Sequence, residues 1–377
     1  MKSLWQAAVL SLALCNAPFA QAAGAMRSMG SAQLAAEMVP GWNLGNSLEA
    51  IGRRSYVWGS REFNETAWGN PKANQALFDA VKAAGFRSVR IPAAWKQYAD
   101  SRDNISPQWM ARVAEVVDSA RKAGLYVMLN VHWDGGWLQP DYAHRDAANA
   151  RLARYWTQIA THFRDYGDTL LFAGTNEVMV DGDWSAPTAE YCEVQKGFNQ
   201  VFIDTVRATG GNNARRHLVV QSFNTNIDHA LSCNAAMPKD RIADRLMMEV
   251  HFYDPWEFAI KTDSDSWKWG QAANPSGWAN ESYIDGQMKK MKTAFIDKGY
   301  PVILGEYGAI QRKEYDPSGA HRRHWDQYVT RSAVAHGLVP MYWDNGYTSN
   351  HEFGLFDRAT GAQAFPDVIG AIVNAAK

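Results

Sequence analysis

Two glutamates each close a short apolar run, at a point where a buried β-strand would end. Glu177 ends the run TLLFAGTNE, and Glu306 ends the run PVILGE. Continuous apolar runs of this length are typical of strands buried on both faces, and parallel barrels build their active sites at the carboxyl ends of such strands. Glycoside hydrolysis needs two carboxylates facing one cleft, because one protonates the leaving oxygen while the other attacks or activates water. The alternative is that both acids make only structural hydrogen bonds.

Other polar and aromatic residues stand near the ends of further apolar runs. Such groups are costly to bury without partners, so a shared functional site explains them better than separate structural roles. Besides the two glutamates, the candidates are Asn46, Arg90, His132, Asn176, His251, Tyr253 and Trp343.

The chemistry of these side chains predicts their roles. The acid must hold its proton near neutral pH and the nucleophile must not, and two close carboxylates push each other's pKa values apart. Arg90 carries a permanent charge that would keep Glu306 ionised, and Tyr253 can donate a hydrogen bond to the same carboxylate. Asn176 can bind a sugar 2-hydroxyl. Two histidines could bind hydroxyls or tune the acid, although a structural hydrogen bond explains either equally well: His132 and His251.

Aromatic residues are abundant, with 16 Trp and 15 Tyr among 377 residues. Partly exposed flat rings suit the apolar faces of sugars, although core packing is the alternative. Four tryptophans follow predicted strands closely enough to serve as sugar platforms, and Trp343 would form the floor beside the cleaved bond: Trp137, Trp184, Trp256 and Trp343.

Strand-like runs alternate with amphipathic segments along the chain. Apolar residues recur at helical spacing over 70–86 and 107–125, and a final helix is predicted over 366–377. Eight strand–helix repeats predict an α/β fold of one domain, a closed parallel (β/α)8 or TIM barrel over residues 24–377. The Gly-rich phosphate turn of a doubly wound open sheet is missing after the first strand. The predicted strands are 41–47, 88–93, 126–132, 169–177, 217–223, 246–254, 301–308 and 338–346.

The first residues predict a secretory signal peptide over 1–23, with a positive charge at Lys2, a short apolar segment and small residues before the cleavage point. We therefore expect a secreted protein, extracellular or periplasmic, that does not stay in the membrane after the signal is removed. An oxidising compartment permits a disulfide between Cys192 and Cys233, but sequence alone does not show that the sulfurs meet.

The formal net charge is −1. This balance gives no electrostatic reason to expect binding to nucleic acid or to an anionic membrane surface. We expect a monomer that acts on a polysaccharide.

An ordered set of motifs resembles glycoside hydrolase family 5, and in particular its bacterial endo-β-1,4-glucanases, including the branch that also cleaves xyloglucan. The motifs span essentially all of the mature chain: GWNLGNSLEA, ETAWGNP, FRSVRIPAAW, NVHWDGGW, TNE, HFYDPWEF, ILGEYG, YWDNG and FGLFDR. The resemblance implies a (β/α)8 barrel, a retaining double displacement and no cofactor. It makes Glu177 the acid/base and Glu306 the nucleophile, and it matches Arg90, His132, Asn176, His251, Tyr253 and Trp343 to the family's remaining strand-end set.

Two positions depart from the family pattern. Val178 follows the acid where the family usually has proline, and Trp133 stands where many relatives have a second histidine. Both departures bear on the shape of the subsites and not on the carboxylates.

The sequence leaves three alternative functions to consider. A β-mannanase or xylanase could use the same scaffold, because one fold hosts several specificities. A metal-dependent hydrolase would need a cluster of ligands, whereas His132 and His251 have no close His or Cys partner in the sequence, and no metal is expected. A non-catalytic glycan-binding protein would not need both glutamates. The predicted substrate is a β-glucan polysaccharide, cut within the chain along an open groove.

Overall fold

A computed structural model describes residues 24–52, 64–233 and 236–377 of the protein. The signal peptide predicted over 1–23 lies outside the described residues, so its cleavage stays a prediction. Within these residues eight parallel strands pair in sequence order, and the last pairs with the first, so the sheet closes into a barrel. The predicted (β/α)8 fold is therefore confirmed. The strands are β1 Gly41–Leu44, β2 Ser88–Ile91, β3 Tyr126–Asn130, β4 Leu170–Ala173, β5 Leu218–Gln221, β6 Leu246–Phe252, β7 Val302–Tyr307 and β8 Leu338–Asp344.

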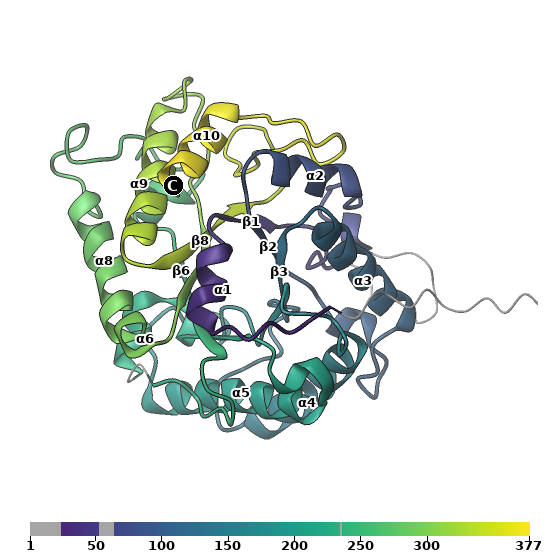
Figure 1. Cartoon of the computed structure of the whole chain (residues 1–377). Helices are drawn as coiled ribbons and strands as arrows, with labels where there is room; N and C mark the ends of the chain where they lie inside the picture. The colour runs from purple at the N-terminus through teal and green to yellow at the C-terminus, as the bar shows by residue number, and fades with distance from the viewer. Residues whose placement is uncertain (1–23, 53–63, 234–235) are drawn as a thin grey trace, which may run out of the picture.

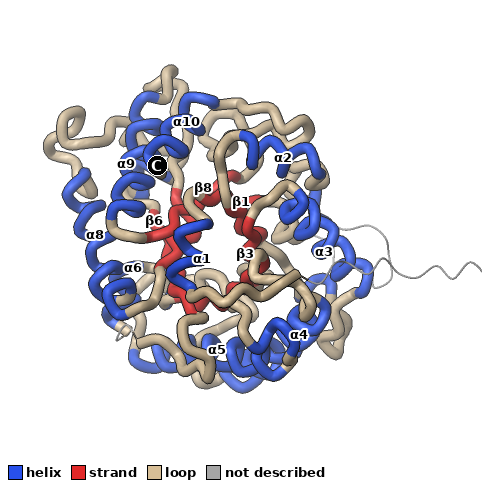
Figure 2. Tube along the Cα trace, viewed as in Figure 1, coloured by secondary structure: helices blue, strands red, loops and turns tan. Residues whose placement is uncertain are grey.

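Helices surround the barrel, as Figure 1 shows, while Figure 2 places the strands at its centre. The helices predicted over 70–86, 107–125 and 366–377 correspond to α2, α3 and α10. Helix α2 has only 9 of the residues in its predicted range, whereas α3 and α10 are slightly shorter than expected. The α-helices are α1 Ser31–Glu37, α2 Gln75–Ala83, α3 Pro107–Lys122, α4 Arg145–His162, α5 Ala189–Ala208, α6 Ile227–Ser232, α7 Trp256–Ala259, α8 Glu281–Ala294, α9 Ala320–Ala335 and α10 Pro366–Ala375.

Every strand ends one to four residues before its predicted end. The largest difference is at β4, which was expected to reach Glu177 but stops at Ala173. Beyond Ala173 the backbone leaves the ladder, and the N–H of Glu177 donates to the side-chain oxygen Oε1 of Gln221 at 3.0 Å instead of to a neighbouring strand. The polar residues at the rim therefore stand largely on the loops that follow the strands.

The barrel interior is apolar at one end and polar at the other. Helix α1 lies across the end of the barrel that faces the viewer in Figure 1. It packs Leu34, Ala35 and Met38 against inward-facing strand residues to form one buried cluster. The inward residues of that cluster are Met128, Leu171, Ala173, Val219, Met247, Ile303, Val339 and Met341. Burial of this apolar surface closes the amino-terminal end of the barrel.

Cys192 and Cys233 form a disulfide, with their Cα atoms 5.3 Å apart. The bond links α5 to the residue that follows α6, as the sequence had permitted. No helix within the described residues combines the length and the apolar character needed to cross a bilayer.

Candidate active site

Glu306 lies on β7 at an irregularity in the ladder. Val250 of β6 pairs with Leu304, but the next pair is His251 with Glu306, so Gly305 is an extra residue. A bulge of this kind re-aims the side chains that follow it. Glu306 consequently points into the barrel beside His251 and is only 5% exposed.

Two donors hold the carboxylate of Glu306. Arg90 Nη1 donates to Oε1 at 2.8 Å, and the Tyr253 hydroxyl donates to Oε2 at 3.0 Å. Arg90, fully buried in β2, also donates to Asn43 Oδ1 at 3.1 Å and to Asn176 Oδ1. Burial and the nearby carboxylates raise the pKa of Tyr253 well above its usual value, so its hydroxyl keeps the proton that it donates. Both contacts favour the ionised form of the Glu306 carboxylate.

Glu177 stands on the loop after β4 with a positive φ of 45°, a conformation that non-glycine residues rarely adopt. Strained backbone of this kind concentrates at functional sites. The side chain of Glu177 is 40% exposed, in contrast to that of Glu306, which is 7% exposed. Glu177 is therefore the carboxylate that solvent, or a ligand in the cleft, can reach more easily.

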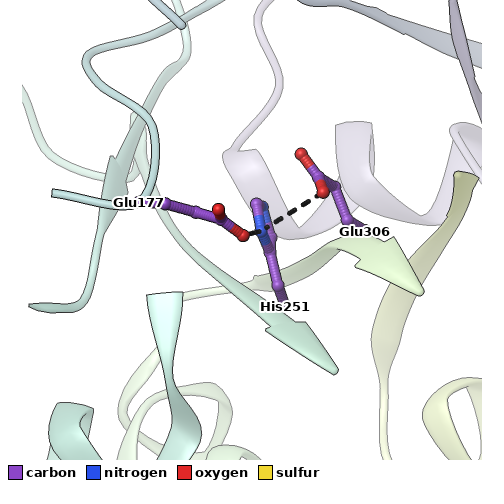
Figure 3. Close-up of side chains that lie close together, drawn as sticks. All are labelled: Glu177, His251 and Glu306. Atoms are coloured by element: carbon purple, nitrogen blue, oxygen red, sulfur yellow. Dashed lines mark hydrogen bonds and ion pairs between the residues drawn. The ribbon is translucent and has the colours of Figure 1, made fainter. Parts of the chain in front are cut away.

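His251 lies between the two carboxylates, as Figure 3 shows. Its Nδ1 is 2.7 Å from Glu177 Oε1 and 3.6 Å from Glu306 Oε2. One oxygen of each glutamate and one ring nitrogen of His251 all lie within 4.8 Å of one another. One carboxylate oxygen of Glu177 and one of Glu306 thus lie within 4.8 Å of each other, close enough to act on the same bond.

The pKa shifts differ from the sequence-based expectation. Burial alone would lower the pKa of His251, but the surrounding carboxylates raise it to about 9. Burial would raise the pKa of Glu177, yet the hydrogen bond and charge of His251 outweigh it and the pKa is lowered. The pKa of Glu306 is raised, because burial and the charge of Glu177 outweigh the opposing influence of His251, Arg90 and Tyr253. Without substrate, the shared proton therefore resides on His251, whereas we expected it on Glu177.

His132 and Trp343 form one wall of the site. Their rings are parallel within 7°, with centroids 6.2 Å apart. Burial and the positive charges of Arg90 and His251 hold the pKa of His132 well below its usual range, so its ring is neutral. Asn130 Nδ2 lies 3.2 Å from Nδ1 of that ring and donates to it. This neutral, flat wall suits the face of a sugar ring.

The carboxylates open into a cleft made of two adjoining cavities. One has a volume of about 500 Å³ and contains both glutamates, and the other, of about 300 Å³, extends from Glu177 past Trp133. Trp256, which is 49% exposed, lines the first cavity, and Trp133, which is 48% exposed, lines the second. Three residues line both: His132, Glu177 and Trp184. The cleft therefore continues on both sides of Glu177.

The tryptophans proposed as platforms divide into two groups. Trp184, Trp256 and Trp343 all line the larger cavity. The prediction for Trp137 was wrong, because that side chain is only 8% exposed and packs edge-on against Tyr155 of α4, with ring centroids 5.6 Å apart. Its position in the chain was compatible with either outcome, and the packing partner, Tyr155, lies on the next helix along the chain.

Asn46 is also outside the site. It lies in the turn after β1, where its N–H donates to Glu49 and its carbonyl accepts from Asn70 Nδ2 at 3.0 Å. The residue lines neither cavity of the cleft. The contacts of Asn46 stabilise the turn and do not reach the carboxylates.

Two residues of the site were not predicted. Glu249 lies beneath His251 on the same face of β6, and Gln221 holds the backbone of Glu177. Trp133, which was expected to affect the shape of the subsites, lines the smaller cavity. An acid within the apolar run LMMEVHFYD, two residues before a histidine, was a signal that could have identified Glu249.

Glu177, His251 and Glu306 have the residue types of a cation site. The guanidinium of Arg90 already binds Glu306 at 2.8 Å, and the Nδ1 atom of His251 is occupied by Glu177. A further positive charge in this place would be repelled by both cations, so the donor set fits acid–base chemistry better than metal binding.

Comparisons with known proteins agree with this geometry. The family model described as Cellulase (glycosyl hydrolase family 5) matches residues 54–349. The chain is 43% identical to a xyloglucan-specific endo-beta-1,4-glucanase of Bacteroides ovatus, over 93% of this chain and 71% of the relative. It is 39% identical to Endoglucanase A of Paenibacillus barcinonensis, over 93% of this chain and 91% of the relative. A solved structure of a Bacteroides ovatus family 5 xyloglucanase with a XXXG heptasaccharide superposes with a TM-score of 0.86 at 41% identity, covering 93% of this chain and 77% of that one.

Proposed function

Because this chain belongs to glycoside hydrolase family 5, we propose that it is an endo-β-1,4-glucanase that cleaves by double displacement. Glu306 is the nucleophile and Glu177 the acid/base. The observation that carries the proposal is the spacing of the two glutamates, which have carboxylate oxygens within 4.8 Å of each other. Retaining enzymes place these groups about 5–5.5 Å apart, whereas inverting enzymes leave about 6.5–9.5 Å for a water molecule.

In the first step, an oxygen of Glu306 attacks the anomeric carbon of the sugar while the bond to the leaving oxygen breaks. Glu177 gives its proton to that oxygen, and the sugar is left as an ester of Glu306. Arg90 and Tyr253 keep Glu306 pointed at the attack position through contacts of 2.8 and 3.0 Å. This fixed geometry supplies the orientation on which the rate of the step depends.

In the second step, the carboxylate of Glu177 accepts a proton from a water molecule, and the hydroxide oxygen attacks the anomeric carbon. The ester bond to Glu306 breaks, and the sugar leaves with its original β configuration. The partial exposure of Glu177 supports this role, because the water must reach it from the cleft.

The proton for the first step is stored on the His251–Glu177 pair. His251 Nδ1 and Glu177 Oε1 are 2.7 Å apart, and the pair is neutral overall whichever partner holds the proton. A sugar bound in the cleft removes water from Glu177. Desolvation favours the uncharged forms of both groups, so the proton moves to Glu177 when the substrate arrives.

Two features support cleavage within the polymer chain and tolerance of branched glucan. The cleft extends to both sides of Glu177 and carries exposed tryptophans along its length. The comparisons include a xyloglucan-specific relative and a xyloglucanase with a bound heptasaccharide. We therefore include xyloglucan among the substrates of this chain.

A panel of soluble β-1,4-glucan, mixed-linkage glucan, xyloglucan, glucomannan, mannan and xylan tests the substrate class, with product sizing. We expect the viscosity of glucan and xyloglucan solutions to fall before much reducing sugar is released. Reducing sugar that rises at constant viscosity would contradict internal cleavage, and turnover of mannan or xylan alone would reassign the specificity. Binding without turnover of any polymer would indicate a glycan-binding protein.

The site of action and the oligomeric state are also proposed. The disulfide supports an oxidising compartment, in keeping with the signal peptide expected over 1–23. Sequencing of the amino terminus of protein recovered outside the cytoplasm tests removal of that segment. Light scattering during gel filtration tests for a monomer, and a stable larger mass would contradict it.

A further inference from the structure

A third carboxylate lies inside the barrel, beneath the two that face the cleft. Glu249 occupies the middle of β6, between Met247 of the apolar cluster and His251 of the site, and all three point to the same face of the strand. Glu249 is fully buried, with 0% exposure. A buried ionised carboxylate is costly unless charged or hydrogen-bonded partners surround it.

The partners of Glu249 lead directly to both catalytic candidates. Its Oε1 is 2.8 Å from Nε of Arg90, the residue that binds Glu306 through Nη1. The same oxygen is 3.3 Å from Nε2 of His251, the residue that binds Glu177 through Nδ1.

A third contact completes the connection. Gln221 Nε2 donates to Glu249 Oε2 at 2.9 Å, while Oε1 of the same amide accepts the backbone N–H of Glu177 at 3.0 Å. Glu249 therefore contacts one support of Glu306 and two supports of Glu177.

The bulge at Gly305 of β7 leaves space for the side chain of Glu249. A Cβ atom on Gly305 would lie 2.8 Å from Cδ of Glu249 and closer still to its Oε1. Glycine before Glu306 is therefore needed for Glu249 to reach Arg90 and His251. The bulge that re-aims Glu306 and the space for the buried carboxylate come from the same residue.

From these contacts we propose that Glu249 is a positioning residue of the active site, which locks Arg90 and His251 in the orientations that hold Glu306 and Glu177. The inference rests on the proposed roles of those two glutamates. Glu249 has no exposed surface and does not touch substrate, so it acts only through its partners.

The charges around His251 explain how Glu249 affects the protons that the imidazole ring carries. Carboxylates face both of its ring nitrogens, Glu177 at Nδ1 and Glu249 at Nε2, and Glu306 lies 3.6 Å from Nδ1. Arg90 adds a positive charge to this cluster through its contacts with Glu249 and Glu306, while the low pKa of His132 keeps that ring neutral. An imidazole that donates from both nitrogens must carry both protons. Glu249 thereby keeps on His251 the proton that Glu177 needs.

The test replaces Glu249 with glutamine, which preserves the volume and removes the charge. We expect Glu249→Gln to lower kcat about 100-fold with little change in KM, which is the cost of misplacing catalytic groups by about 1 Å. Loss of one carboxylate also lowers the pKa of His251, so the high-pH limb of the activity profile moves to lower pH.

Glu65→Gln is the matched control. Glu65 is also fully buried and pairs with an arginine, Arg112, at 2.7 Å, but that pair lies outside the cleft. We expect the control to lose stability and keep both kcat and the pH profile. A kcat for Glu249→Gln no lower than that of the control, or an unmoved high-pH limb, would overturn the inference. Glu306→Gln assayed in parallel separates the two claims, since turnover by that variant would refute the proposed function itself.

If Glu249→Gln does not fold, a measurement on the unmodified protein tests the contact between Glu249 and His251. The ¹⁵N shifts of the His251 ring report the protons on both nitrogens, with assignment by comparison to His251→Asn. We expect a doubly protonated ring at pH 7. A proton on Nε2 supports the contact with Glu249, whether or not Nδ1 is also protonated, and a ring without a proton on Nε2 at that pH would overturn the inference.

Discussion

The two ends of the barrel interior differ in what they contribute. At the amino-terminal end, inward-facing residues such as Met247, Leu171 and Ile303 pack with α1 in an apolar cluster. At the carboxyl-terminal end, the same strands present arginine, glutamate and histidine. On β6 the change occurs within five residues, from Met247 through Glu249 to His251. One set of strands thus supports a packed core at one end and a charged site at the other.

The two ends of the barrel also differ in how much they contribute to the stability of the fold. Burial of apolar surface stabilises the fold, whereas buried charges contribute little net stability even when they are paired. Positive φ values at non-glycine residues occur after strands at Asp134, Glu177 and Asn224, and also before β6 at Asp244. The buried arginine, histidine and glutamates that surround the cleft cost stability, and a functional role explains why they lie together there.

The largest effect is expected from Glu306→Gln. The amide keeps the shape of the side chain but cannot attack the anomeric carbon, so turnover falls by a factor on the order of 10⁶, the cost of losing a catalytic nucleophile in a hydrolase. The thermal unfolding midpoint is expected to change little or to rise, because a buried carboxylate is removed. Initial rates on soluble glucan, with calorimetry on the same sample, check both. Activity of a few per cent of the unmodified protein would refute the assignment.

The next largest effect is expected from Glu177→Ala. Loss of the general acid costs about 10²–10⁴-fold on natural glucans. An aryl glycoside with a good leaving group needs no proton, so its first step is largely preserved, and added azide restores turnover by attacking the ester. Rates on both substrates, with and without azide, measure this. Equal losses on both substrates would contradict the acid role.

A substitution at the amino-terminal end of the barrel is expected to affect stability and not catalysis. Leu171→Ala removes a fully buried side chain from the apolar cluster and is expected to cost about 2–5 kcal/mol of unfolding free energy. Urea unfolding measures the loss. The folded fraction is expected to keep the kcat of the unmodified protein at 25 °C, and a lower kcat would show that the two ends are coupled.

A smaller effect is expected at the outer cleft. Trp256 is 49% exposed and lines the larger cavity, so Trp256→Ala removes a stacking surface worth about 1 kcal/mol, or several-fold in affinity for long oligosaccharides. Trp137→Ala instead removes packing against α4 and lowers stability without this selective loss. Isothermal titration with short and long oligosaccharides distinguishes them. Equal losses on both lengths would mean that Trp256 only packs.

A further prediction concerns how the stability of the fold changes with pH. The folded pKa of His251, about 9, is above its ordinary value of 6.5, so protonated His251 stabilises the folded state. That contribution is complete below about pH 6.5 and is lost as the pH rises toward 9. Urea unfolding at a series of pH values is expected to show a steeper decline for the unmodified protein than for His251→Asn. Parallel curves would contradict the raised pKa.

The sequence predicted the barrel, its eight strands and the two glutamates, because long apolar runs and acids at their ends are local features. It did not predict the bulge at Gly305, since a bulge depends on register with the neighbouring strands. It also failed at Trp137, whose burial depends on how its ring packs against Tyr155, a contact that the sequence does not show. Glu249 was missed although it stands in an apolar run two residues before His251, and its contacts with Arg90 and Gln221 on other strands follow only from the fold.

The most direct test of the account is to trap the covalent intermediate. A 2-deoxy-2-fluoro cello-oligosaccharide with a good leaving group forms the ester but slows its hydrolysis, and mass spectrometry of a protease digest then locates the sugar. We predict one sugar adduct on the peptide that contains Glu306, and none on the peptides with Glu177 or Glu249. An adduct on either of those glutamates, or inversion of the product at the anomeric carbon with no adduct at all, would contradict the double displacement proposed for this site.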